Sequence, residues 1–189
     1  MNYQEIYDKY QTRFTTLNMR IYSHTFEEDL LLFRWWIKLN ETGDIKKLLP
    51  ISSHRLGAFL SLFESPTILF YALDRNGEIE YVSWFKDPAG SSIFAGFWAN
   101  QGLRGTRRFI ELIFTSGPVI FEFYDSILGL TWQIDLLRLH MKIGYKVVGN
   151  LENFLDQPSV WMVRVTKEDF YNSRIASVYN RMKEKEDGS

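Results

Sequence analysis

Three arginines precede a predicted helix in the segment FWANQGLRGTRRFIELI, residues 97–113. Arg104, Arg107 and Arg108 lie beside two glycines and before an apolar helical pattern. Unpaired N–H groups in the first turn of a helix favour anions, glycines let a ligand approach the backbone, and arginines add positive charge. This combination indicates a phosphate site. A solvated basic helix face that follows an ordinary turn is the alternative interpretation.

Three further side chains could transfer protons. Glu122 lies between two phenylalanines in the predicted strand VIFEFY, where an acid either meets a partner or has its pKa raised by desolvation. Tyr124 ends that strand, and His140, on a later predicted helix, has an unperturbed pKa of about 6.5. Each has a structural alternative: a solvated or arginine-paired Glu122, a packed Tyr124, and a surface or core His140. Glu80, which alternates with Glu78, is interpreted as the solvent face of a hairpin.

Several other kinds of site are not predicted. The chain has no cysteine, which excludes disulfides, thiolate zinc sites and a protein thiol as nucleophile. His24, His54 and His140 are far apart and lack the paired spacing of metal ligands, so we expect no metal. No nucleophile-elbow pattern supports a serine hydrolase site.

Length and charge limit the class of protein. The chain has 189 residues, of which 46% are hydrophobic and 16% aromatic, so we expect one folded domain over residues 1–189. The formal net charge is −1, so no global field attracts nucleic acid or an anionic membrane surface. The N-terminal residues are unlike a secretory signal, and Arg34 and Lys38 interrupt the most apolar run. We therefore expect a cytoplasmic protein without a membrane segment.

The first strongly periodic segment is a predicted helix over about 26–39. Thr25 and Glu28, which precede and begin it, have capping-box spacing. We expect the core stripe of this helix to be Phe26, Leu30, Phe33 and Ile37. Trp35 and Trp36 cannot both face one core, so an interface patch near one of them is an alternative to a larger core.

The remaining pattern alternates strands and helices. A second helix, capped by Ser52 or Ser53, is followed by the strands TILFYAL and EIEYVSWF, which DRNG joins in a hairpin. SSIFAGFW completes a meander after a turn in DPAG, and a helix over about 105–115 leads to the strand VIFEFY. The next helix ends at Gly144 and is expected to bury Trp132, Leu136, Leu139 and Ile143. YKVVG and SVWMVRV are the last predicted strands, NMRIYS is a first one, and both terminal segments are predicted helical additions.

This order of elements resembles the GCN5-related N-acetyltransferase (GNAT) fold over roughly residues 17–166. The segment LLRLHMKIGYKVVGN is similar to the late helix and following strand of that family, and WMVRVTKEDF is similar to its last core strand. The resemblance implies an α+β fold with a mixed, mostly antiparallel sheet of six or seven strands flanked by helices. Small acetyltransferase-like proteins of bacteriophages have loops similar to LRGTRRFIELI, which suggests a phage protein.

The family's acetyl-CoA loop has Gln or Arg, two residues, Gly, one residue, then Gly or Ala. If Gln101 takes the first place, Arg104 and Thr106 stand where small residues are expected, and Gly102 and Gly105 are out of register. The resemblance implies that the pyrophosphate lies over this loop. The cofactor-binding residues it implies are Phe97, Trp98, Gln101, Gly102, Leu103, Arg104, Gly105, Thr106 and Arg107.

The resemblance also implies a reaction, the transfer of an acetyl group from acetyl-CoA to a primary amine. Strands SSIFAGFW and VIFEFY would separate to admit the pantetheine, and the backbone N–H groups near Phe97 and Trp98 would polarise the thioester carbonyl. His140 stands where many relatives have an acid tyrosine, with Tyr124 as a rival, and Glu122 is the expected base. The acceptor stays open between a protein lysine, a protein N-terminus and a small amine. The alternatives are an inactive binding module with this fold, which contacts a protein partner such as a host protein, and a fold that holds CoA as a structural ligand.

Overall fold

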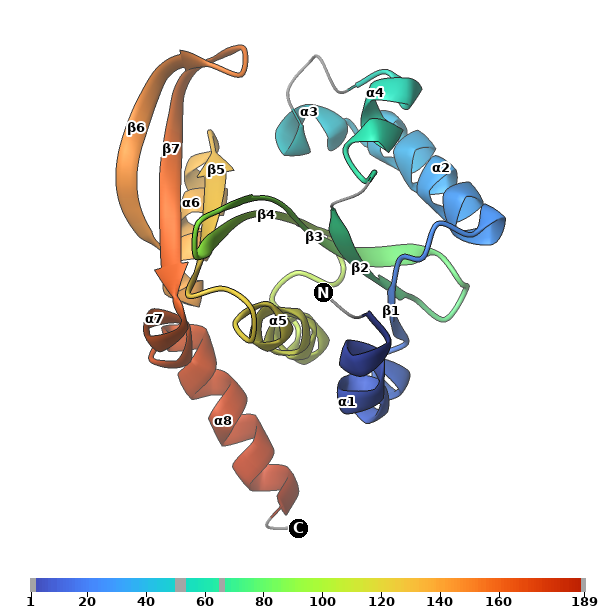
Figure 1. Ribbon diagram of the computed structural model, residues 1–189, viewed down its shortest axis with the longest axis vertical. Coiled ribbons are helices and arrows are strands. Elements are labelled where there is room, and N and C mark those ends of the chain that lie inside the picture. The colour runs from blue at the N-terminus through green and yellow to red at the C-terminus, as the bar shows by residue number, and fades with distance from the viewer. Residues whose placement is uncertain (1–2, 50–53, 65–66, 188–189) are drawn as a thin grey trace. The chain divides into compact units, whose positions relative to one another are not determined.

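The structure is a computed structural model that describes residues 3–49, 54–64 and 67–187 (Figure 1). Its contacts divide the chain into two compact units. The first unit comprises the residues up to Asp87 together with Gly96–Leu112, and the second comprises Pro88–Ala95 and the residues from Ile113 onward. The organisation of residues 1–189 as a single domain stays a prediction.

Seven strands form one sheet in the order β1-β2-β3-β4-β5-β7-β6. Their bounds are β1 Met19–Ile21, β2 Ile68–Leu73, β3 Ile79–Ala89, β4 Ser92–Ala99, β5 Ser126–Thr131, β6 Lys146–Phe154 and β7 Gln157–Thr166. The pairs β1–β2, β2–β3, β5–β7 and β6–β7 are antiparallel. Strands β4 and β5 are parallel and pair Ser92 with Ser126, Ile93 with Ile127 and Phe94 with Leu128. The predicted α+β class and the mostly antiparallel sheet are therefore confirmed.

Helices α1 (Tyr3–Thr16), α2 (Phe26–Glu41), α3 (Ile45–Leu48) and α4 (Leu56–Ser61) belong to the first unit. Successive side chains of β2 point to opposite faces of the sheet, as in any pleated strand. Leu69 and Tyr71 join the core beneath α2 and α4, whereas the Phe70 ring lies 6.0 Å from that of Phe14 in α1. The expected caps of the second helix, Ser52 and Ser53, lie outside the described residues, and Arg55 takes the cap position of α4.

Helix α2 buries the face opposite to the predicted one. The capping box at Thr25 is present, but the expected core stripe of Phe26, Leu30, Phe33 and Ile37 is exposed. The buried residues are Leu32, Trp35 and Leu39. They continue the helical stripe that begins at Glu28, whose Oε1 accepts a hydrogen bond of 2.9 Å from the Tyr71 hydroxyl of β2. This polar contact and the Trp35 ring, which packs on Phe59 and Phe63, select the buried face.

Helix α5 (Arg107–Ile120) extends beyond its predicted end and replaces the predicted strand VIFEFY. Ser116, Gly117 and Pro118 were expected to end it, yet all three are helical. A Cβ at Gly117 would lie 2.9 Å from Phe170 Cζ, so the glycine lets this ring approach the helix closely. Phe170 also packs on Phe114 and Phe121, with ring centroids 4.6 Å and 5.4 Å away. This packing in the second unit outweighs the helix-breaking tendency of the Gly-Pro pair, and the next strand is β5.

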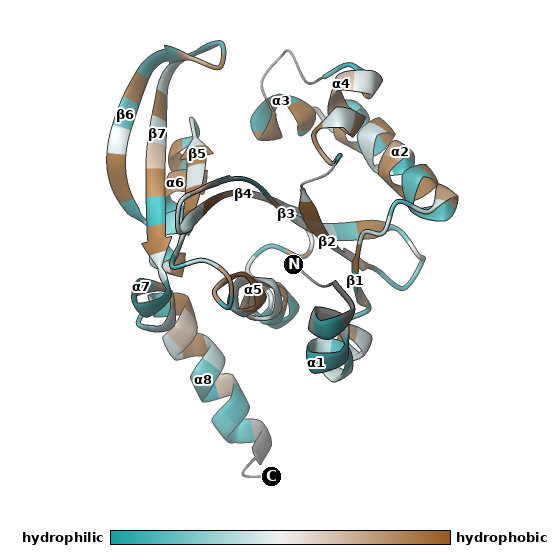
Figure 2. Cartoon of the chain, viewed as in Figure 1, coloured by the Kyte–Doolittle hydropathy of each residue, from teal (hydrophilic) through white to brown (hydrophobic). Residues whose placement is uncertain are grey.

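The rest of the second unit agrees with the predicted order. Helix α6 (Ile134–Ile143) ends at Gly144, which has φ +104°, the left-handed conformation typical of a C-cap. Its buried residues are Leu137, His140 and Ile143. Of the predicted stripe, Ile143 is therefore confirmed as buried, whereas Leu136 and Leu139 are half-buried and Trp132 lies before the helix. Two C-terminal helices follow, α7 (Lys167–Tyr171) and α8 (Arg174–Asp187), and α8 is largely hydrophilic along its length (Figure 2).

Among the described residues, every helix is too short or too polar to cross a membrane.

Candidate functional site

The loop between β4 and α5 has a defined conformation built from side-chain hydrogen bonds. The N–H of Leu103 donates to Asn100 Oδ1 at 2.8 Å and to the Asn100 carbonyl oxygen at 3.2 Å, so the side chain and the backbone of Asn100 together close a turn. The Thr106 hydroxyl donates to the carbonyl oxygen of Leu103 at 2.7 Å and accepts from the N–H of Phe109 at 3.2 Å. Thr106 is therefore the N-cap of α5, a role that serine and threonine favour.

Two residues of the β4–α5 loop that depart from the family pattern, Gly105 and Thr106, have structural roles. Thr106, which stands where a small residue was expected, binds the Phe109 N–H, so that amide is already satisfied within the protein. Gly105 has φ +77°, where a side chain would be strained, and among the described residues other than its two chain neighbours no atom lies within 4 Å of the position of a Cβ there. The loop thus keeps an open backbone at Gly105, two residues before helix α5 begins.

Arg108 points into the protein rather than toward a ligand. Its Nε is 2.5 Å from Glu80 Oε1, and its Nη2 donates to the carbonyl oxygens of Leu17 at 2.8 Å and Leu73 at 3.2 Å. Glu80 is buried, so its interpretation as the solvent face of a hairpin is wrong. A charged side chain can be buried when it is paired and hydrogen-bonded, and Arg108 satisfies that requirement for Glu80.

Arg104 and Arg107 remain half-exposed at the beginning of α5. The Nε of Arg104 donates to the carbonyl oxygen of Ala99 at 2.9 Å, and its Nη2 lies 3.8 Å from Asp44 Oδ2. The Nε of Arg107 lies 3.1 Å from Glu111 Oε1, one helical turn further along α5. Their side chains keep 45% and 50% of their surface exposed. Two arginines, rather than three, can therefore contact an anion in solution.

The aromatic residues of the predicted cofactor segment anchor it to the core of the first unit. Trp98 is buried, and its indole nitrogen donates to Asp44 Oδ2 at 3.4 Å. Phe97 is half-buried, and its ring centroid lies 6.4 Å from that of Phe109. Of the other predicted cofactor-binding residues, Leu103 is buried, whereas Gln101 and Gly102 are exposed.

Asp44 and Asn100 are organising residues that the sequence did not single out. Asp44 joins Trp98 and Arg104 from the beginning of α3, and no sequence spacing connects these positions. Asn100 could have been found, because Asn followed closely by glycine is typical of side-chain-closed turns.

Glu122 and Tyr124 lie in the turn after α5, not on a strand. The N–H of Glu122 bonds to the carbonyl oxygen of Val119 and that of Tyr124 to the carbonyl oxygen of Ile120, so this segment continues the winding of the helix. Glu122 is exposed and Tyr124 half-buried. The expected position of Glu122 on a central apolar strand is thus wrong. Its role as a base and that of Tyr124 as an acid stay predictions.

His140 is buried in the second unit, with 7% of its surface exposed. Its Nδ1 lies 2.7 Å from the carbonyl oxygen of Leu136, so the neutral ring carries its proton on Nδ1 and presents Nε2 as an acceptor. Burial lowers the pKa of His140 to about 4, although the contact with the Leu136 carbonyl opposes this change. The expected ordinary pKa is wrong, and the ring is neutral at pH 7. An acid role for His140, which stays a prediction, requires Nε2 to gain a proton first.

The depressed pKa of His140 predicts a loss of stability in mild acid. The unfolded chain binds a proton with a pKa of about 6.5, whereas the folded chain does so only near pH 4, so stability falls as pH drops below 6.5. The free energy of unfolding, measured with urea, should be lower at pH 5 than at pH 7.5. This decrease is expected to be about 2 kcal/mol larger for the wild type than for His140→Gln. The exposed His24, changed to Asn, is the control and should keep the full difference. Equal pH dependence of the wild type and His140→Gln would contradict the burial of a neutral ring.

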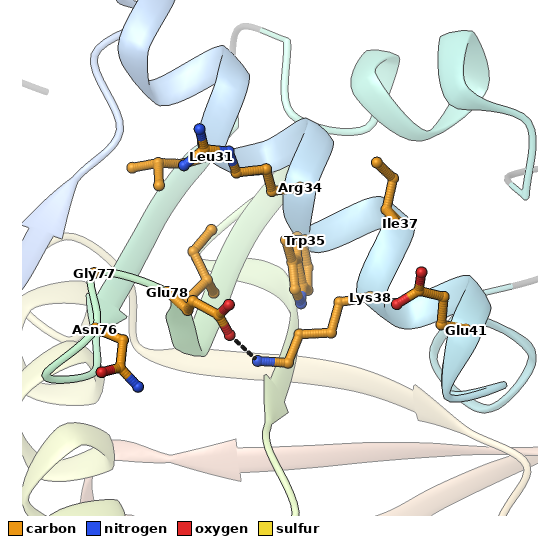
Figure 3. A pocket seen from close by; sticks show the side chains of 10 residues that line it. Leu31, Arg34, Trp35, Ile37, Lys38, Glu41, Asn76, Gly77 and Glu78 are labelled. Carbon is orange, nitrogen blue, oxygen red and sulfur yellow. Dashed lines mark hydrogen bonds and ion pairs between the residues drawn. The ribbon is translucent and has the colours of Figure 1, made fainter.

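A cavity of about 560 Å³ lies within the first unit, away from the β4–α5 loop in sequence. It is lined by α2 and the β2–β3 turn, with the Lys38–Glu78 ion pair, 2.8 Å long, at one side (Figure 3). None of its lining residues belongs to the predicted cofactor segment.

Comparisons with known proteins support the fold. No model of a protein family matches the sequence, and no curated protein matches it in sequence. A ribosomal-protein-S5-alanine acetyltransferase from Vibrio fischeri matches the structure with a TM-score of 0.63 at 9% identity, over 81% of this chain and 95% of that one. Spermidine N-acetyltransferase from Vibrio cholerae, in complex with CoA and spermine, gives 0.62 at 11% identity, over 81% and 98%.

A GCN5-related N-acetyltransferase from Kribbella flavida also matches, with a TM-score of 0.58 at 12% identity, over 79% of this chain and 98% of that one. These likenesses span nearly the whole of the solved chains, but their identities are too low to carry a shared activity. They confirm the predicted fold: this chain has the fold of the GCN5-related N-acetyltransferases.

Proposed function

We propose that the protein is an N-acetyltransferase that transfers the acetyl group of acetyl-CoA to a primary amine. The observation that carries the proposal is the β4–α5 loop, which has an open Gly105 backbone and two half-exposed arginines, Arg104 in the loop and Arg107 at the first residue of α5. The fold adds weight, because the Vibrio cholerae enzyme with this fold is in complex with CoA and spermine.

The residues of this loop fit a diphosphate. Arg104 and Arg107 can donate charge-assisted hydrogen bonds to phosphate oxygens, and the positive end of the α5 dipole favours the same anion. Replacing the small residues of the family pattern by Arg104 and Thr106 does not close the loop, because Arg104 turns toward Ala99 and Thr106 folds back onto Leu103. The backbone at Gly105 therefore stays accessible to a ligand.

Acetyl-CoA, when bound, supplies an acetyl group on a thioester that an amine attacks directly, so no protein nucleophile is required. The roles left to this chain are to polarise the carbonyl, to accept a proton from the amine and to return one to the leaving thiolate. Backbone N–H groups near Phe97 and Trp98 are proposed for the first role. Glu122 is proposed as the base, and Tyr124 or His140 as the acid; the neutral state of His140 at pH 7 favours Tyr124.

The acceptor is proposed only as a primary amine. Proteins with this fold include one named for the alanine of a ribosomal protein and one named for spermidine, so the fold accommodates both protein and small-molecule acceptors. A cytoplasmic location and a phage origin are part of the proposal.

Thiol release from acetyl-CoA tests the proposed reaction. We expect thiol release that depends on an added amine, with kcat lowered at least about tenfold by Tyr124→Phe or Glu122→Gln if these residues transfer protons. The exposed Asp135→Asn, on α6, is the control variant. A panel of small amines and N-terminal and lysine-containing peptides identifies the acceptor class.

The second candidate is a binding module with this fold and no turnover. It is favoured by one observation: His140, where relatives have an acid tyrosine, is buried and neutral. Acetyl-CoA binding with no thiol release on any amine would support a fold that holds CoA as a structural ligand. No binding and no release would support the module that contacts a protein partner.

A further inference from the structure

The outer face of α2 exposes four large apolar side chains in one helical stripe. Within this outer stripe, defined as Phe26, Leu30, Phe33 and Ile37, the exposed fractions are 78%, 40%, 36% and 36%. The stripe runs about 16 Å along the helix, since each residue adds about 1.5 Å. The other face of α2 is already buried in the core, and the helix carries hydrophobic bands along its length (Figure 2). A contiguous apolar stripe of this kind marks an interaction surface.

The outer stripe is held in place by its neighbours. The ring of Phe33 stacks on that of Trp36, with centroids 6.1 Å apart and an interplanar angle of 18°. Trp36 is fixed in turn, because its indole nitrogen donates to the carbonyl oxygen of His54 at 2.9 Å. A partner therefore meets a surface that is already ordered, and association costs less side-chain entropy.

The charges beside the stripe indicate what kind of partner fits it. Glu27 and Arg34 are separated by two helical turns and lie along the same edge of the outer stripe. Within the described ranges neither side chain has an ion-pair partner. When two copies of one helix pack antiparallel about a two-fold axis, the same edges face each other. Glu27 of each copy then meets Arg34 of the other, whereas in parallel packing about a two-fold axis these two edges would not face each other.

The apolar residues have the same self-complementarity. With the two-fold axis between Leu30 and Phe33, Phe26 of one copy lies opposite Ile37 of the second copy, and Leu30 lies opposite Phe33. Ile37 borders the cavity described above, together with Leu31 and Arg34 (Figure 3). Phe26, with 78% of its surface exposed, therefore reaches the Ile37 side of that cavity on the second copy. Each copy offers both the projecting ring and the recess that receives it.

We propose that the outer stripe of α2 is a homodimer interface, in which α2 of a second copy packs antiparallel with reciprocal Glu27–Arg34 ion pairs. Such an isologous contact closes on itself and needs no other partner.

Sedimentation velocity of the full-length protein between about 1 and 100 μM tests the interface. The wild type is expected to form a concentration-dependent dimer. Phe33→Glu should raise the dimer dissociation constant at least about tenfold, because a carboxylate would be buried opposite Leu30. Phe123→Glu is the matched control, since Phe123 is 45% exposed in the second unit and should leave the dimer unchanged. Circular dichroism verifies that the variants fold, which these exposed positions allow.

Charge reversal tests the antiparallel arrangement. Glu27→Arg and Arg34→Glu should each weaken dimerisation by about tenfold, and the weakening should diminish at high salt. The double variant restores opposite charges only in antiparallel packing, so it should regain the wild-type dissociation constant. A monomer at 100 μM, a dimer insensitive to Phe33→Glu, or a double variant weaker than either single one would overturn the proposal. Dimerisation is independent of acetyl-CoA, so its failure leaves the proposed reaction untouched.

Discussion

Replacing Arg108 with methionine is expected to lower the free energy of unfolding by about 3 kcal/mol. Arg108 is the partner of the buried Glu80, and it also donates to the carbonyl oxygens of Leu17 and Leu73. Methionine keeps much of the side-chain volume but leaves the Glu80 carboxylate buried without its cation. The value lies at the lower end of the range for broken buried pairs because a third of the Arg108 side chain, 35%, is exposed.

Urea unfolding of matched variants separates this effect from a general loss of charge. Arg107→Met removes an exposed ion pair one residue away and should change stability by no more than about 0.5 kcal/mol. The double variant Glu80→Met with Arg108→Met should recover most of the loss, because it removes both charges. An Arg108→Met protein as stable as Arg107→Met would contradict the structural role of Arg108 and return it to the set of candidate phosphate ligands.

Replacing Gly96 with alanine is expected to cost about 3 kcal/mol of stability. A Cβ at Gly96 would overlap the indole ring of Trp84, since Cζ2 and Cε2 of that ring already occupy the space. Trp84 is itself packed against Phe63, with ring centroids 5.9 Å apart, so the ring cannot shift without disturbing the core. The glycine thus lets Trp84 lie directly on β4, immediately before Phe97.

The control for this prediction is Gly102→Ala, where the nearest atom to a new Cβ, Asn100 Oδ1, is 3.9 Å away. Thermal unfolding should show a lower midpoint for Gly96→Ala and little change for Gly102→Ala. Trp84→Leu in the Gly96→Ala background should lose less stability than Trp84→Leu costs the wild type, because the smaller side chain relieves the overlap. Additive losses would show that the ring does not constrain Gly96.

Much of the fold followed from local signals in the sequence. The Asn-Gly turn gave the β2–β3 hairpin, the Thr25 and Glu28 spacing gave the start of α2, and Gly144 gave the end of α6. These features depend on residues close together in the chain. Two predictions were wrong because the features they concern depend on contacts between residues far apart in the chain. The buried face of α2 is chosen by Tyr71 and the aromatic core, and the length of α5 by the ring of Phe170.

The candidate site was less predictable for the same reason. Sequence analysis found the arginine cluster, but it could not tell that Arg108 turns inward to Glu80 while Arg104 and Arg107 stay half-exposed. Spacing along a helix shows which side chains share a face, but it does not show which face is buried. The protonation state of His140 could not be predicted from the sequence either, since it follows from the burial of the ring in the folded protein.

The central claim, that the β4–α5 loop binds acetyl-CoA through Arg104 and Arg107, is tested most directly by the dissociation constant of acetyl-CoA. Calorimetric titration should show binding by the wild type and a loss of at least about tenfold in affinity for Arg104→Glu and for Arg107→Glu. Arg75→Glu, an exposed reversal in the β2–β3 turn, should bind as the wild type does. No binding at millimolar acetyl-CoA, or equal affinity in all four proteins, would contradict the claim.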